Sequence, residues 1–383
     1  MIELNEKVWI DETLNKIRKK MAWVCEKNKD KIPYTTDEDG SYNDMALPKE
    51  RGGDIDWWTN GFWGGIMWLL YHDTKDRQYK NAAEALEKKL QSCLMRYSGL
   101  NHDVGFMYML TAVADYRFTG NKESLRDGMH AAGILAGRFN PVGEYIRAWN
   151  EYAKKVPLEG WAIIDCLMNL SLLYWASEES NDPRFKEIAV KHADTAIKHF
   201  IREDGSVKHI IEFDPSTGEY KRSYGGQGFE HGSSWTRGQG WAVYGYMISY
   251  IHTGKQEYLD NAKKIAHYCI ANIKEDGLIP IDFRQPEAEK LEDSCGACII
   301  ACGLLEVAGY VPETEQSLYR NGAVKILQAI SKWRADWSEN CDAIVQNCSV
   351  AYHDNGRHIS LVYADYFFIE AMYKLKGDTV FMW

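Results

Sequence analysis

Apolar and polar positions divide the chain into helical segments of two kinds. Segments of the first kind are apolar on all sides and rich in aromatic and small residues, whereas segments of the second kind carry one apolar stripe among charged residues. The two kinds follow each other as pairs, joined by short turns such as residues 72–76. A helix that is apolar all round is expected to be buried, and a helix with one stripe is expected to cover it.

The ends of this repeat predict a closed ring. A last apolar segment begins near Ser360 without a following partner, and an amphipathic segment over residues 4–28 has no preceding partner. These two segments complete each other, so the pattern predicts an all-α fold, an (α/α)6 barrel that forms a single domain over residues 1–383. An open solenoid would need terminal repeats with a polar outer face, and neither end has that pattern.

The connections that lead into the apolar helices are long, for example residues 30–57, 138–164 and 201–235. Long connections in a compact domain are usually functional. All of them would emerge where the inner helices begin, so the sequence predicts a pocket at that end of the barrel. Residues 206–224 alternate in polarity around a DPSTGE turn, which predicts a small β-hairpin insertion.

Composition adds a hint about the ligand. Among 383 residues there are 14 Trp, 23 Tyr and 12 Phe, together 13% of the chain, which is more than a core alone needs. Aromatic rings offer an apolar face with a polar tip, and this combination suits sugar rings. The net charge of −10 argues against a nucleic-acid partner, whose binding surface would be basic.

Other classes are disfavoured by simple counts. The first 30 residues lack the apolar stretch of a signal peptide, and no apolar run approaches the roughly 18 residues of a membrane span. Nine scattered cysteines favour reduced thiols and a cytoplasmic location. Cys295, Cys298 and Cys302 recur at helical spacing, which favours packing on a helix face over a metal site. We therefore expect no metal, no cofactor and no membrane partner, while the oligomeric state has no signal in the sequence.

Two aspartates stand out at the predicted pocket. Asp103 and Asp165 each precede an apolar inner helix. Either one alone is readily explained as a helix N-cap. Together, beside histidine, arginine and several tryptophans, they are candidates for acid–base chemistry, because a carboxyl group half-buried against aromatic rings favours its neutral form.

The segments WTNGFWGG, NHDVGF, IIDCLMN and WTRGQGW resemble, in order and spacing, glycoside hydrolase family 88, the unsaturated glucuronyl hydrolases. The resemblance runs from about Trp57 to about Glu370. It implies an (α/α)6 barrel that removes the 4,5-unsaturated uronic acid from the non-reducing end of glycosaminoglycan oligosaccharides left by polysaccharide lyases.

The resemblance also implies site residues. Asp103 and Asp165 match the two essential carboxylates, with Asp165 as general acid and base. The residues that match substrate-binding or sugar-stacking positions are Trp58, Phe62, His102, Trp149, His209, Gln227, Arg237, Trp241 and Tyr352.

The chemistry accounts for these residue types. The C4=C5 bond of the substrate is a vinyl ether conjugated to a carboxylate. We hypothesise that neutral Asp165 protonates C4 and then steers water onto C5, after which the hemiketal rearranges and releases the rest of the chain. Asp103 would hold ring hydroxyls and stabilise the developing positive charge.

The sequence departs from the family pattern in places, and other functions stay open. Gly240 stands where alanine is expected, and no sulfate-binding motif is evident, although Arg357 and His358 could serve or could equally be solvated surface charges. One alternative is a related hydrolase that removes unsaturated galacturonate from rhamnogalacturonan. A non-catalytic sugar-binding barrel would not need two carboxylates, and a protein-binding toroid would not explain the clustered aromatics.

Overall fold

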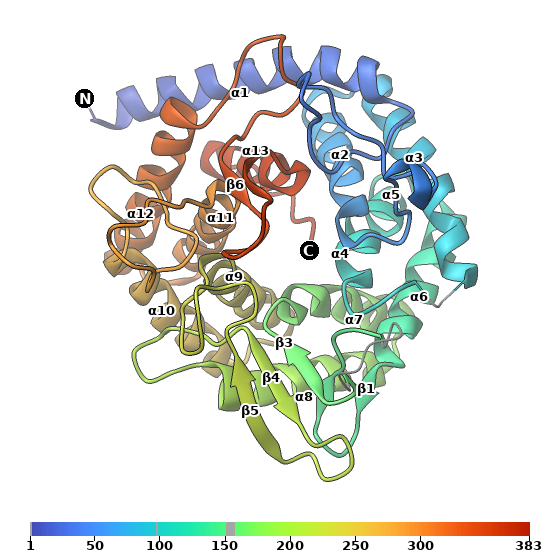
Figure 1. The fold of residues 1–383 in the computed structure, drawn as a ribbon. Helices are drawn as coiled ribbons and strands as arrows, with labels where there is room; N and C mark the ends of the chain where they lie inside the picture. Colours follow the sequence, from blue (N-terminus) through green and yellow to red (C-terminus); the bar gives the residue numbers. More distant parts are fainter. Residues whose placement is uncertain (1, 97–98, 151–157) are drawn as a thin grey trace.

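The helices of the computed structural model, which describes residues 2–96, 99–150 and 158–383, form two concentric rings (Figure 1). In the described residues the inner ring consists of α2 (Phe62–Thr74), α4 (Val104–Tyr108) continued by a π-helical turn (Met109–Val113) and α5 (Ala114–Thr119), α7 (Cys166–Ser180), α9 (Thr236–Thr253), α11 (Ser294–Tyr310) and α13 (Val362–Lys376). The outer ring consists of α1 (Ile2–Asn28), α3 (Arg77–Arg96), α6 (Lys122–Ala136), α8 (Pro183–Phe200), α10 (Gln256–Ala271) and α12 (Glu313–Trp333).

The rings follow from the two kinds of helix. In α9 every residue from Thr236 to Ser249 is buried, as expected of a helix that is apolar all round. In α8 the buried residues recur along one stripe, and Asp182 caps its first turn by accepting a hydrogen bond from the Arg184 backbone N–H at 3.1 Å. The last inner helix, α13, contacts both α1 and α2, so the ring closes. The predicted (α/α)6 barrel is confirmed.

Short strands lie at the end of the barrel where the inner helices begin. The predicted hairpin is present as β4 (Ile210–Phe213) and β5 (Tyr220–Tyr224). A third strand that the sequence did not reveal, β3 (Trp161–Ile163), pairs antiparallel with β4. The remaining strands form two small pairs, β1 (Phe139–Asn140) with β2 (Tyr145–Ile146) and β6 (Cys348–Ser349) with β7 (Arg357–Ile359); two short 3-10 turns are Lys49–Arg51 and Trp58–Gly61.

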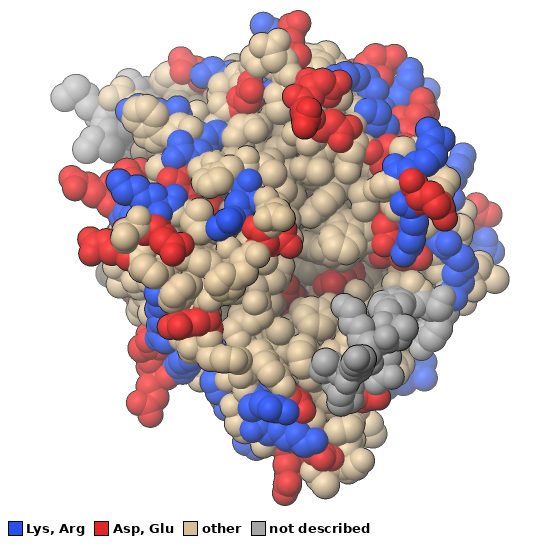
Figure 2. All heavy atoms as spheres, viewed as in Figure 1, with Lys and Arg blue, Asp and Glu red and all other residues tan. Residues whose placement is uncertain are grey.

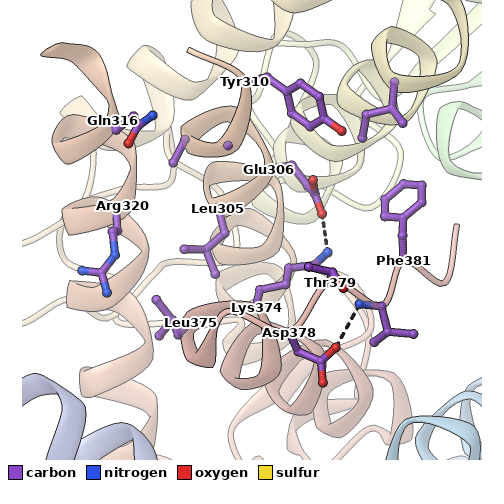
Figure 3. Close-up of a pocket in the computed structure, with 14 residues that line it drawn as sticks. Leu305, Glu306, Tyr310, Gln316, Arg320, Lys374, Leu375, Asp378, Thr379 and Phe381 are labelled. Atoms are coloured by element: carbon purple, nitrogen blue, oxygen red, sulfur yellow. Dashed lines mark hydrogen bonds and ion pairs between the residues drawn. The ribbon is translucent and has the colours of Figure 1, made fainter. Parts of the chain in front are cut away.

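The two ends of the barrel differ. Figure 2, seen from the side of the strands, shows a hollow near the centre of the molecule. At the opposite end, a cavity of about 500 Å³ is lined by residues such as Glu306, Tyr310, Lys374 and Phe381, and none of the predicted site residues lines it (Figure 3). The chemistry therefore belongs to the end where the inner helices begin.

The segment after α13 returns to the barrel axis. Trp383 is fully buried there, and its ring stacks on Phe367 at 6.0 Å and meets Phe106 edge-on at 5.9 Å. Within the described residues, the longest apolar helices fall short of what crossing a membrane requires.

Candidate active site

The two candidate carboxylates stand directly before two neighbouring inner helices. Asp103 precedes α4 and Asp165 precedes α7, and α4 packs against α7. Neither side chain accepts a hydrogen bond from the first turn of its helix, so neither acts as an N-cap. By contrast, Asp293 does cap α11, by accepting from the Cys295 backbone N–H at 3.2 Å. The N-capping interpretation therefore does not account for Asp103 and Asp165.

The surroundings of the two carboxyl groups differ. Asp103 is buried, and burial together with the negative charge of Asp165 raises the pKa of Asp103 well above its usual range. The Asp165 side chain is 13% exposed, and its Oδ2 lies 3.6 Å from His209 Nε2. The two side chains are nevertheless almost equally accessible, at 10% for Asp103 and 13% for Asp165.

Asn169 ties this pair to the backbone, and the sequence reasoning missed it. Its Oδ1 accepts from the Phe106 backbone N–H at 2.7 Å, and its Nδ2 donates to Asp103 Oδ1 at 3.4 Å and to the Asp165 carbonyl at 3.3 Å. The spacing held a signal, because Asn169 follows Asp165 by one helical turn and therefore shares its face of α7.

Two histidines, His102 and His209, lie near the carboxylates and come from two different connections between helices. His102 is fully buried, its Nε2 lies 3.3 Å from Asp103 Oδ1, and burial and the nearby Arg138 charge hold its pKa well below the usual range, so it is neutral. His209 Nδ1 accepts from the Gln227 backbone N–H at 3.0 Å. In a neutral imidazole this leaves the proton on Nε2, which faces Asp165.

Arg237, predicted to bind substrate, is engaged with the protein itself. Its Nη1 donates to Asp293 Oδ2 and to the Ser349 carbonyl, both at 2.6 Å, and its Nη2 donates to the Val350 carbonyl at 2.5 Å. The guanidinium also lies 4.7 Å from the centre of the Trp235 ring. Arg237 therefore holds the segment after β6 against the start of α9.

The aromatic residues predicted to bind sugar differ in how much of their side chain is exposed. Trp58 is half-buried, with its ring 4.9 Å from Tyr363. Phe62 has no exposed surface, because Trp58, Tyr363 and Phe106 cover its ring. The expectation that Phe62 itself stacks on a sugar is therefore wrong for this structure, and Phe62 supports Trp58 from below. Trp241 is also fully buried, although its indole N–H has no hydrogen-bond partner among the described residues.

The remaining predicted residues lie around the rim. Trp149 is half-buried beside Trp161, with ring centres 6.1 Å apart. Gln227 accepts at its carbonyl from the Tyr352 backbone N–H at 2.9 Å. Tyr352 is 3% exposed, its ring packs on Phe229 and its hydroxyl donates to Glu289, so it belongs to the loop layer and not to the carboxylate pair.

Arg357 and His358 belong to the surface. Arg357 donates to the Tyr352 carbonyl at 3.4 Å, and the His358 ring lies 2.8 Å from the Asn347 side-chain oxygen. These contacts, among the described residues, do not bring either side chain to a carboxylate of the pair. The structure therefore favours the interpretation of both as solvated residues.

Polar atoms without partners gather at the pocket. Buried polar groups in proteins are nearly always hydrogen-bonded, so a cluster that lacks partners marks a place where a polar ligand or water completes the bonding. Within the described part of the chain, the buried atoms of this kind near the pair include both ring nitrogens of His102, Asp165 Oδ2, His209 Nε2 and the indole nitrogens of Trp161, Trp235 and Trp241.

Tyr363 is a further residue that the sequence reasoning missed. It stands at the start of α13, it is buried, and its ring lies 5.7 Å from the Arg237 guanidinium. Its position at an inner-helix start was the available signal, since the other candidates were found at such starts.

The cysteines pack as expected. Cys295, Cys298 and Cys302 are buried in α11, and burial raises the pKa of each thiol well above its usual range. Among the described residues, histidine, cysteine and acidic side chains are nowhere grouped closely enough to hold a metal ion.

Comparisons with known proteins place these features in a family. The family model of Glycosyl Hydrolase Family 88 matches residues 17–374. The unsaturated glucuronyl hydrolase of Bacillus sp. (strain GL1) is 33% identical over 366 residues, covering 92% of this chain and 93% of that protein. The solved structure of unsaturated glucuronyl hydrolase from Bacillus sp. GL1, described as responsible for the degradation of glycosaminoglycan, superposes with a TM-score of 0.88 at 31% identity, covering 96% of this chain and 97% of that chain. A mutant unsaturated glucuronyl hydrolase from Streptococcus agalactiae, complexed with dGlcA-GalNAc6S, superposes with a TM-score of 0.82 at 25% identity, covering 98% of this chain and 94% of that chain.

Proposed function

Because the chain belongs to Glycosyl Hydrolase Family 88, we propose that it releases 4,5-unsaturated uronic acid from the non-reducing end of lyase-generated glycosaminoglycan oligosaccharides. The observation that carries this proposal is the meeting of Asp103 and Asp165 beside His209, with unpaired polar atoms around them. We also infer a single domain over residues 1–383, supported by a main apolar core whose members run from Ile10 to Trp383.

Asp165 is the proposed proton donor, as the family resemblance implies, and its Oδ2 is a buried atom without a hydrogen-bond partner among the described residues. Its protonated form transfers the proton to C4, and positive charge appears at C5, shared with the ring oxygen. His209, with its proton on Nε2, keeps the Asp165 carboxyl in place.

Water then completes the reaction. It adds to C5 and gives a proton to the Asp165 carboxylate, which restores the acid. The hemiketal at C5 opens to a ketone, and the hemiacetal at C1 collapses and releases the hydroxyl of the next sugar. Asp103 holds ring hydroxyls; its raised pKa equips it to donate as well as accept a hydrogen bond. The scheme uses neither metal nor cofactor, and the usual distance rule for retaining and inverting hydrolases does not apply to it.

The test follows the conjugated double bond by its ultraviolet absorbance. Unsaturated chondroitin, hyaluronan, heparin and rhamnogalacturonan disaccharides are incubated separately with the protein. We expect loss of absorbance with at least one glycosaminoglycan disaccharide. Loss with rhamnogalacturonan alone would replace the proposal by the related galacturonate activity, and no loss with any substrate would refute the enzymatic proposal.

The role of Asp165 has its own test. Asp165→Asn keeps the shape of the side chain but cannot carry the proton to C4. We expect a loss of turnover of at least about 1,000-fold, within the range of roughly 100- to 10,000-fold for general acid–base catalysis, with little change in substrate binding measured by calorimetry. Near-native turnover of this variant would show that another group is the acid.

The cellular location is inferred from thiol chemistry. The cysteines of the described chain are free, and all except Cys341 are buried. Free thiols persist in a reducing compartment, so we infer a cytoplasmic enzyme.

A further inference from the structure

One face of the β3–β4–β5 sheet continues from the catalytic pair along a row of half-buried rings. β3 ends two residues before Asp165, and β4 begins directly after His209, so both strands lead out of the site. On this face Ala148, Ile163 and Ile210 form a small apolar cluster, and Trp149, Trp161 and Tyr224 pack around it. The opposite face, with Ala162, Ile211 and Phe213, belongs to the main core.

The rings follow one another away from the carboxylates. The backbone N–H of His102 donates to the Ala148 carbonyl at 3.1 Å, which places Trp149 next to the site. Trp149 lies 6.1 Å from Trp161, and Trp161 stacks on Tyr224 with ring centres 4.8 Å apart. The indole N–H of Trp161 has no hydrogen-bond partner among the described residues.

Polar groups accompany the rings at the outer end of the row. The register pairs Trp161 with Glu212 and Glu212 with Arg222 across the three strands. Arg222 Nε donates to Glu212 Oε2 at 2.9 Å, and the Tyr224 hydroxyl donates to the same carboxylate. These hydrogen bonds hold the pKa of Glu212 below its usual value although partial burial opposes them, so Glu212 is an anion that can accept from sugar hydroxyls.

We propose that this sheet face is the subsite for the sugars that follow the cleaved uronic acid, and that the Glu212–Arg222 pair makes it select unsulfated sugars. This inference rests on the proposed function. Two ring-to-ring steps, 6.1 Å from Trp149 to Trp161 and 4.8 Å from Trp161 to Tyr224, lead from the site to the outer end of the row. We therefore assign Tyr224 to a sugar beyond the one next to the scissile bond.

The Arg222 guanidinium decides how this face treats a sulfated sugar. A sulfate group on the bound sugar needs a cation, but Arg222 already shares its charge with Glu212, and the Glu212 carboxylate repels an anion placed beside it. An uncharged sugar meets instead an aromatic surface and a carboxylate acceptor. Neutral, hydroxyl-rich sugars match that set.

The first experiment compares chain lengths. For Tyr224→Ala we expect kcat/KM to fall about tenfold on an unsulfated unsaturated chondroitin tetrasaccharide and less than about twofold on the disaccharide, because only the longer substrate reaches the ring. Tyr220→Ala is the matched control: Tyr220 lies on the same strand, is 43% exposed, and stacks on His199 of α8 instead of on Trp161. We expect this control to change neither value.

The second experiment tests the charge pair. Glu212→Gln keeps the shape of the side chain and frees Arg222, so the ratio of kcat/KM for a 6-sulfated over an unsulfated tetrasaccharide should rise at least about threefold. Arg222→Gln should lower that ratio. Melting temperatures of all variants identify any variant that fails to fold, and Tyr224→Phe, which keeps the ring, then replaces Tyr224→Ala with an expected milder loss on the tetrasaccharide alone.

The outcomes separate the two proposals. Equal losses on disaccharide and tetrasaccharide, or no loss on either, would overturn the subsite while leaving the hydrolase activity intact. An unchanged sulfation ratio in Glu212→Gln would overturn the selection by charge. A wild-type protein without activity on any unsaturated substrate would instead defeat the proposed function.

Discussion

Among single residues, Asn169 is the one whose loss should separate catalysis from simple stability. Its amide serves three groups at once, the Asp103 carboxylate, the Phe106 N–H and the Asp165 carbonyl. Asn169→Ala leaves the buried Phe106 N–H without a partner, which costs about 1–3 kcal/mol, and leaves Asp103 free to turn away from the substrate. We expect kcat to fall at least about tenfold, measured with the ultraviolet assay.

Asn28 provides the control for that substitution. It is equally buried, but it bonds to the Val24 carbonyl and to Asp342, away from the pair. Asn28→Ala should lower the melting temperature by a similar amount while leaving kcat unchanged. If both variants lose stability and activity in parallel, Asn169 is a structural residue and its positioning role is wrong.

At the scale of elements, the contact between α4 and α7 fixes how the two carboxylates meet. A Cβ atom on Gly105 would lie 2.6 Å from the Asn169 Cα, so any larger residue forces the helices apart. We expect Gly105→Ala to destabilise the fold by about 1–3 kcal/mol and to lower kcat strongly. Gly133, inside α6 with nothing within 4 Å of its would-be Cβ, is the matched control, and Gly133→Ala should be neutral or stabilising by up to about 1 kcal/mol. Full activity in Gly105→Ala would contradict this account of the pair.

Another junction of elements depends on pH. Asp365, at the start of α13, accepts from the Tyr42 hydroxyl at 2.6 Å and from the Val345 backbone N–H at 2.7 Å, and burial raises its pKa to about 6. In the unfolded chain its pKa is about 3.9, so between pH 4 and pH 6 the folded state binds the proton more tightly. The contribution of Asp365 to the free energy of unfolding therefore declines by about 3 kcal/mol in total as pH rises through this window. Above the window the contribution is constant.

Asp365→Asn removes this titration. Denaturant titrations at pH 4 to 7 give the free energy of unfolding of both proteins. The wild-type value minus the variant value should fall as pH rises to about 6 and then level off. A difference that does not change with pH would mean that Asp365 has the same pKa in both states.

For the whole molecule, the sequence pattern predicted the architecture more completely than it predicted the details of the site. The helix pairs were predictable because burial on all sides and burial on one stripe leave different patterns. The pairing of Trp161 with Glu212 could not be predicted, because it joins segments far apart in the chain and only three residues of β3 take part. Likewise, the position of Phe62 beside Trp58 in the sequence says nothing about which ring covers the other. Exposure at a site depends on neighbours from several helices, and a linear motif does not contain them.

Trp383 joins the inner helices of the barrel across its axis. Its ring contacts Phe62 of α2, Phe106 of α4, Tyr244 of α9 and Phe367 of α13, and the first two of these rings also pack against Trp58. Trp383→Ala should lower the free energy of unfolding by about 3–5 kcal/mol by leaving an apolar cavity. The loosened floor under Trp58 should raise KM more than it lowers kcat.

Indole, which matches the missing side chain, gives the decisive measurement because dry apolar cavities bind ligands of their own shape. Added indole should raise the melting temperature of Trp383→Ala and return KM toward the wild-type value, with no effect on the wild type. If indole restores the melting temperature but leaves KM unchanged, the axis stabilises the barrel without shaping the site. Because Trp383 also donates from its indole nitrogen to Glu370 Oε2 at 3.3 Å, naphthalene should rescue less well than indole.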